Sequence, residues 1–213
     1  MKKCFLLLLV LFASHTTYAS CVRYPIDFSV KTDTGKIIYD TRYSREEFAR
    51  IAKMKASPHT VGLTVTSSPQ IIMKVTKQTR STLDTYCVQP SFVELLIKYD
   101  KITVYIDKKY PKNSCNFKVT KEHEDYHVAV FQQAIEFFKP DIEKALKNAI
   151  QELKPEKVFS EKQADVVIQK QKNQIYKKLK PVMEHINKKI VEKNYAIDTP
   201  ESYKKTTKRC KKW

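Results

Sequence analysis

Beyond its first 19 residues, the sequence lacks any apolar segment that is long and uncharged enough to cross a bilayer as a helix. It also lacks internal repeats and low-complexity blocks, which argues against a repeat architecture. Glycine is scarce, with 2 residues in 213, and none follows position 119. These absences leave a globular chain, and 42% hydrophobic content is enough to build one domain with a real core.

The first residues are typical of an export signal. Lys2 and Lys3 precede an apolar run at 4–13, and small and polar residues follow up to Ala19. We therefore expect residues 1–19 to be removed as a signal peptide, leaving a secreted or periplasmic single domain at 20–213. A lipid anchor on Cys21 is the alternative, although the leucine usually found three residues before a lipidated cysteine is absent.

The mature chain holds four cysteines, at positions 21, 87, 115 and 210. An even number suits disulfide formation in an oxidising compartment. A hairpin folded about residue 100 would bring residue 87 opposite roughly residue 113. This predicts Cys87–Cys115 and, by elimination, Cys21–Cys210, with free thiols as the alternative.

Positive charge dominates, with 40 Lys and Arg against 23 Asp and Glu and a formal charge of +17. Such a surface attracts anions, including acidic substrates, envelope polymers and nucleic acid. The lysines are spread along the chain, so they indicate no specific nucleic-acid site. The densest run, at 204–212, is typical of a solubilising tail.

The chain changes character near residue 119. Before it, β-branched and aromatic residues dominate and predict strands, with one short helix at 44–52. Ser44 is placed to cap that helix, and Glu47 three residues later completes a capping box. The predicted strands are 36–39, 61–66, 70–75, 92–98 and 102–107.

From residue 120 onward the apolar period is helical. It predicts two long helices, 120–153 and 160–194, each kinked or broken where Pro140 or Pro181 removes a backbone donor. The expected fold class is therefore α+β: a mostly antiparallel sheet with one short helix, followed by a long C-terminal helical hairpin.

The segment His123-Glu124-Asp125-Tyr126-His127 carries the strongest chemical signal. Two histidines four residues apart on a helix share one face and can bind one zinc ion. The glutamate after the first histidine is placed to take a proton from a zinc-bound water. Since Val130, Ala134 and Phe137 continue the same face, both histidines should point toward the body of the domain.

A third zinc ligand is less clearly indicated. If the two long helices are antiparallel about residue 156, the residue level with His127 is His185, which we take as the third ligand. The two prolines blur that register by several residues. Glu184, Glu192 and Asp198 therefore remain alternatives.

Several motifs follow one another along the chain: Ile38-Tyr39-Asp40, Ser44-Arg45-Glu46-Glu47, Ser57-Pro58, Gly62-Leu63-Thr64, Cys87, Tyr110-Pro111, Cys115 and His123-Glu124-Asp125-Tyr126-His127. Their order resembles that of a bacterial family of predicted secreted zinc-dependent proteases. The resemblance covers roughly residues 27–200. It implies an extracytoplasmic hydrolase with His123 and His127 as ligands and Glu124 as base. The family often ends in a Thr-x-His-Gly segment; here Asp198 and Thr199 match in part and the His-Gly is absent.

The sequence thus predicts a secreted zinc metallohydrolase, a peptidase by resemblance, acting on a peptide or an envelope polymer. Glu124 would be the catalytic base. A second hypothesis is a non-catalytic envelope protein that holds anionic polymers on its basic surface and whose metal site is structural or vestigial.

Overall fold

The computed structural model describes residues 21–53, 61–81 and 85–213. The expected signal peptide at 1–19 and the Ser57-Pro58 motif lie outside the described residues. The elements are β1 (Asp27–Asp33), β2 (Lys36–Asp40), α1 (Arg45–Ile51), β3 (Gly62–Thr66), β4 (Gln70–Ser81), β5 (Tyr86–Lys98), β6 (Lys101–Ile106), α2 (Cys115–Glu152), β7 (Glu156–Val158), α3 (Glu161–Ile197) and α4 (Pro200–Thr207).

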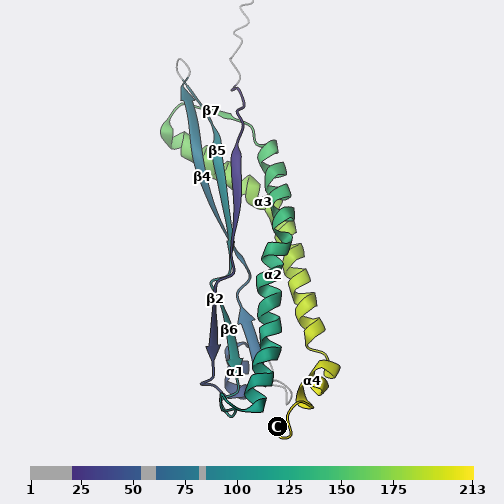
Figure 1. The fold of residues 1–213 in the computed structure, drawn as a ribbon. Coiled ribbons are helices and arrows are strands. Elements are labelled where there is room, and N and C mark those ends of the chain that lie inside the picture. The colour runs from purple at the N-terminus through teal and green to yellow at the C-terminus, as the bar shows by residue number, and fades with distance from the viewer. Residues whose placement is uncertain (1–20, 54–60, 82–84) are drawn as a thin grey trace, which may run out of the picture.

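Two small sheets lie end to end (Figure 1). Three stretches of chain, β1–β2, β3–β4 and β5–β6, each contribute one strand to either sheet. The first sheet has the order β1-β5-β4, with β7 paired to β5, and the second has the order β2-β6-β3. The pairs β1–β5 and β2–β6 are parallel, whereas β4–β5, β3–β6 and β5–β7 are antiparallel. The α+β class is confirmed, with mixed sheets in place of a mostly antiparallel one.

The hairpin expected about residue 100 is wrong. β5 and β6 belong to different sheets, and the chain passes from one to the other without reversing. Tyr99 anchors this passage, because its backbone N–H donates to the Asp33 carbonyl at 3.1 Å and its ring is buried against Phe131. Gly35 approaches the same point with φ of +71°, where a Cβ would lie 2.6 Å from the Tyr99 carbonyl oxygen.

The predicted disulfide pairing is wrong for the same reason. The bonds are Cys21–Cys87 and Cys115–Cys210. β1 is parallel to β5 with Asp27 opposite Phe92, and this register brings Cys21 alongside the start of β5, where Cys87 lies. The disulfide also uses the sulfur that a lipid anchor on Cys21 would need.

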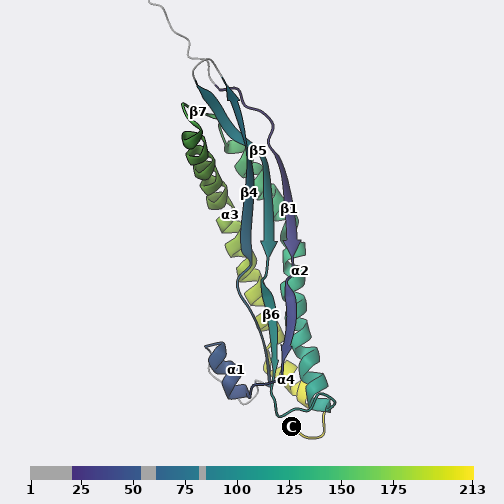
Figure 2. The same ribbon diagram turned by 90° about the vertical axis from the view of Figure 1, so that its left-hand side faces the viewer.

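The helices α2 and α3 lie side by side over one face of the sheets (Figures 1 and 2). Both continue through Pro140 and Pro181, so of the two expected effects, a kink or a break, the break does not occur. The main core lies between this helix pair and the first sheet. Its largest fully buried members are Tyr99, Leu95, Ile97, Ile135, Ile142, Leu146, Ile175, Leu179 and Ile186.

The capping box of α1 is confirmed: Ser44 Oγ accepts from the Glu47 N–H at 3.3 Å, and the Glu47 carboxylate accepts from the Ser44 N–H at 2.6 Å. The predicted basic tail is partly helical, because Thr199 caps α4 and Pro200 occupies its first turn. Among the described residues, no helix combines the length and apolar character that a membrane crossing requires.

Candidate metal centre

His123, Glu124 and His127 lie on α2 and are buried, as the apolar stripe of that helix predicts. The stripe continues into buried Ala134, but Phe137 at its far end is 72% exposed. The rings of the two histidines meet edge to face with centroids 5.1 Å apart. The i, i+4 spacing therefore places both imidazoles at one point.

Asp198 completes a group of three ligand atoms at this point. It follows directly after α3, and its Oδ1 lies 3.1 Å from His123 Nε2 and 3.2 Å from His127 Nε2. All three atoms lie within 4.8 Å of one another. In a tetrahedral site with zinc–ligand bonds of about 2.0–2.1 Å, neighbouring ligand atoms are roughly 3.3 Å apart. The spacing of the carboxylate from each imidazole fits that geometry.

Asn194 fixes the orientation of His127. The Asn194 amide nitrogen donates to the Ile190 carbonyl at 2.9 Å, which turns the amide oxygen toward His127 Nδ1 at 2.8 Å. Nδ1 must therefore carry the hydrogen. In the neutral ring, Nε2 then presents a lone pair to the Asp198 carboxylate, so two acceptors face each other. Such a contact needs a proton or a metal cation between its partners.

The electrostatics of the group match this requirement for positive charge. Burial by itself would raise the pKa of Asp198, but hydrogen bonds from His123 and His127 outweigh it and hold the pKa well below its usual range. Burial would lower the pKa of His127, and the bond to Asp198 outweighs that effect and raises it. The carboxylate is thus ionised and oriented toward the two rings.

Glu124 lies beside the group and is 4% exposed. Thr64 on β3 donates to its Oε2 at 2.8 Å. Burial raises the pKa of the Glu124 carboxyl, whereas the nearby histidines lower it. The net direction of the Glu124 pKa is upward, and a carboxyl group with a raised pKa accepts a proton more readily than an ordinary one.

The sequence analysis did not predict that Tyr203, on α4, is part of the candidate site. Its hydroxyl donates to Asp198 Oδ1 at 2.8 Å, and its ring lies 5.2 Å from that of His123. Burial raises the pKa of Tyr203, as does the hydrogen bond to Asp198, so the phenol stays a neutral donor. The Thr199-Pro200 pair is a helix-start signal that would have predicted α4 and placed Tyr203 one turn into it.

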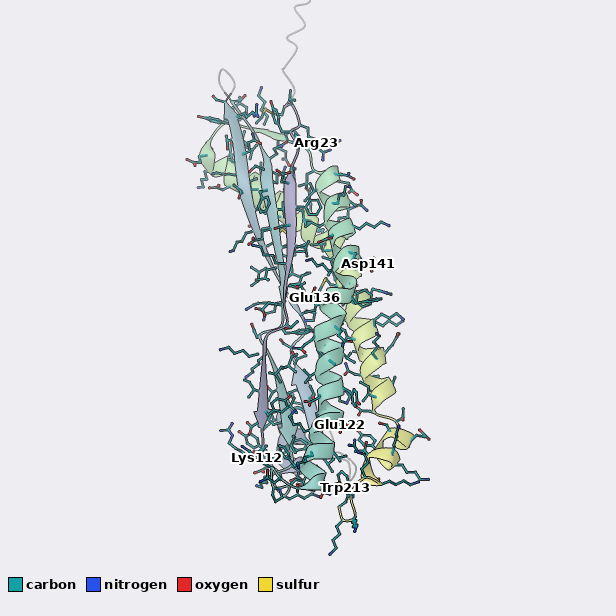
Figure 3. The ribbon with its side chains drawn as sticks, in the orientation of Figure 1. Arg23, Lys112, Glu122, Glu136, Asp141 and Trp213 are labelled. Carbon is teal, nitrogen blue, oxygen red and sulfur yellow. A yellow bond between two sulfur atoms is a disulfide. The ribbon has the colours of Figure 1, made fainter. Side chains whose placement is uncertain are left out.

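The C-terminal segment that carries Tyr203 is fastened to the start of α2. Cys210 is bonded to Cys115, and Arg209 pairs with Glu122 at 2.8 Å. Figure 3 shows Glu122 and Trp213 at this end of the molecule. The disulfide therefore holds α4 against the helix that presents both histidines.

The structure does not bring the other proposed ligands to the histidine pair. The ring of His185 lies against Phe138, Glu184 pairs with Lys180, and Glu192 pairs with Lys189. The predicted register fails because β7 carries the chain across to β5, so α3 begins beyond the strands and runs obliquely toward α2 (Figure 1). Asn194 is consequently beside His127, nine residues after position 185.

An open cleft of about 370 Å³ leads to the group. Its walls come from β3, the 67–69 linker, α2 and the end of α3. Glu124, His127, Asp198 and Tyr203 all line it. Two candidate ligands, His127 and Asp198, and the candidate base are thus accessible from one side, whereas His123 lines a separate hollow with Glu122 and Tyr126.

Comparison with protein-family models, with curated proteins and with solved structures finds no match to this chain. The geometry of the group and its cleft therefore carries the functional argument.

Proposed function

We propose that the chain is a zinc-dependent hydrolase that cleaves peptide bonds outside the cytoplasm. One observation carries the proposal: His123, His127 and Asp198 converge beside a buried glutamate at an open cleft. Two imidazoles and one carboxylate are a donor set that suits zinc and leaves a position for a reactant. The arrangement agrees with what the resemblance to secreted zinc-dependent proteases implies.

Each residue then has a defined task. A zinc ion held by the three ligands supplies Lewis-acid chemistry, lowering the pKa of water and polarising a carbonyl group. Glu124 takes the proton from the attacking water and delivers it to the leaving nitrogen. Thr64 holds the Glu124 carboxylate in place through its hydroxyl donor. Tyr203 orients Asp198 by donating to Oδ1.

The edge of the second sheet favours a peptide as the substrate. β3 is an edge strand, and the Val61 carbonyl accepts from the Asp107 N–H at 3.1 Å. Because antiparallel pairs alternate, the backbone groups of Gly62, Thr64 and Thr66 point away from β6. These three residues line the cleft, and the described part of the chain offers them no other backbone partner. An extended peptide can add to such an edge as a further strand.

Two features support an extracytoplasmic location. The chain forms two disulfides, which persist in oxidising compartments. Its first residues are typical of an export signal.

Metal analysis of the purified mature chain tests the proposal. We expect about one zinc per chain, lost in His123→Ala. Glu124→Gln should keep the metal and lose hydrolysis of a casein-derived peptide library. Glu143→Gln is the matched control, because Glu143 lies on the same helix, 19 residues beyond Glu124 and away from the histidines. This control variant should keep both the bound zinc and the hydrolysis of the peptide library.

A chain without zinc, or unchanged hydrolysis in Glu124→Gln, would overturn the proposal. Stoichiometric zinc without hydrolysis of any peptide would instead favour the non-catalytic envelope protein, which the charge of +17 suits.

A further inference from the structure

A second hollow, of about 440 Å³, adjoins the cleft at the metal group. The two share Ser68 and Pro69 on the linker between β3 and β4, and Asn187 on α3. The cleft and the second hollow therefore form one continuous groove along the edge strands β3 and β4. The metal group lies at one end of this groove and the second hollow at the other.

The second hollow is apolar in character. Ile71 on β4 and Tyr176 and Met183 on α3 provide its walls. Lys180 and Glu184 also line it, but they pair with each other at 3.7 Å and their side chains are 75% and 66% exposed. Their charged ends therefore lie at the rim, and their methylene stems contribute to the wall. Such a surface favours an apolar side chain over a charged one.

Two independent measures place this hollow along the groove. On α3, Met183 precedes Asn194, which contacts His127, by eleven residues, or about 16 Å of helix. On the strand side, Thr64 contacts Glu124, and Pro69 lies five residues beyond it, or about 17 Å of extended chain. Both distances correspond to about five residues of an extended peptide.

We propose that this hollow is a specificity subsite for a bulky apolar side chain of an extended peptide, about five residues from the cleaved bond. The inference rests on the proposed peptidase function and names the substrate class of the same site. Peptides too short to reach the hollow are poor substrates, and long peptides with an apolar residue at this distance are preferred.

A peptide scan tests the subsite. Twelve-residue peptides of Ser, Thr and Gly carry one leucine, moved through every position. Mass spectrometry maps the bond that the zinc-loaded wild type cleaves. Fluorescence anisotropy measures the binding of labelled peptides to zinc-loaded Glu124→Gln, in which no turnover interferes. We expect one leucine position, about five residues from the cleaved bond, to tighten binding about tenfold or more.

A charge swap makes the test specific. Met183→Glu, made in the Glu124→Gln background, should abolish the advantage of leucine and give one to lysine at the same position. Val166→Glu is the matched control, because Val166 is an exposed apolar residue of the same helix outside both hollows. It should leave the leucine preference unchanged.

The failures are distinguishable. If the wild type cleaves no peptide and Glu124→Gln binds none, the proposed function fails and the subsite with it. If peptides are cleaved but the leucine position has no effect, only the subsite is overturned. Persistence of the leucine preference in Met183→Glu has the same consequence.

Discussion

Gly62 lies directly against the Glu124 carboxylate. A Cβ built on Gly62 would come within 2.6 Å of Glu124 Oε1 and 2.7 Å of Thr120 Cγ2. These are side-chain atoms, so an added methyl group can be accommodated only by moving them. The close approach of β3 to α2 thus depends on a residue without a side chain, and it sets the position of the candidate base.

We therefore expect Gly62→Ala to displace Glu124 and lower peptide hydrolysis at least about tenfold, with zinc retained. Overpacking of this kind costs about 1–3 kcal/mol of stability. Gly35→Ala is the matched control. It strains a left-handed residue, and the atoms nearest the added Cβ belong to the Tyr99 and Asp100 backbone rather than to Glu124 or a candidate ligand, so it should lower stability without lowering activity per folded molecule. Equal activity losses in both variants would contradict this account of Gly62.

Asp198 should be the third ligand. Asp198→Ala removes the oxygen that lies 3.1 and 3.2 Å from the two imidazoles. We expect zinc affinity, measured by competition with a chromophoric chelator, to fall at least about a hundredfold, since only two protein ligands remain. His185→Ala should bind zinc as the wild type does, because its ring lies against Phe138. If instead His185→Ala lost zinc affinity and Asp198→Ala kept it, His185 would be the third ligand.

Asn194 should affect the zinc affinity of the same site, although it is not itself a candidate ligand. Asn194→Leu removes the acceptor that fixes the His127 tautomer. Loss of such a partner typically lowers metal affinity about 10–100-fold. Asn187→Leu, seven residues earlier on α3 and also facing the cleft, serves as the control and should leave zinc affinity unchanged. Equal affinity in all three proteins would show that Asn194 does not orient the ring.

The local features of this fold could be predicted from the sequence. Ser44 and Glu47 form the expected capping box, and the i, i+4 histidines share a buried face of α2. These predictions succeed because each depends on neighbours within one or two helical turns.

Predictions that depend on distant pairing failed. Tyr99-Asp100 is consistent with a turn in isolation, but burial of Tyr99 against Phe131 keeps the chain extended there. One wrong reversal then misplaced Cys87 relative to Cys115. Likewise, the path of α3 depends on β7 pairing with β5, which three residues of sequence do not reveal. Asp198 was therefore only one of several alternatives for the third ligand.

Glu47 should make stability depend on pH. A hydrogen bond from the Ser44 backbone, together with one from Lys108 at 2.9 Å, lowers the pKa of Glu47 to about 2. Because this pKa lies below the ordinary value of 4.5, the ionised carboxylate stabilises the fold above about pH 4.5. The stabilisation is lost as the pH falls toward 2. Urea unfolding should therefore show a shallower acid loss in Glu47→Gln than in the wild type. Parallel pH profiles would contradict the assignment.

The two disulfides should differ in their effect on the metal site. They join residues 66 and 95 positions apart, so chain entropy predicts that loss of either lowers stability by about 4–5 kcal/mol. Only Cys115–Cys210 fastens α4, and with it Tyr203 and its bond to Asp198, to the start of α2. We expect the Cys115→Ser, Cys210→Ser double variant to lose zinc affinity at least about tenfold at a temperature where circular dichroism shows it folded.

The Cys21→Ser, Cys87→Ser double variant is the matched control, because its bond lies at the other end of the long strands, away from the histidines. It should lose comparable stability and bind zinc with the affinity of the wild type. This contrast separates a general loss of stability, which both variants share, from a local loosening of Asp198. Equal zinc affinity in the two double variants would mean that the α3–α4 segment holds Asp198 in place without its covalent link to α2.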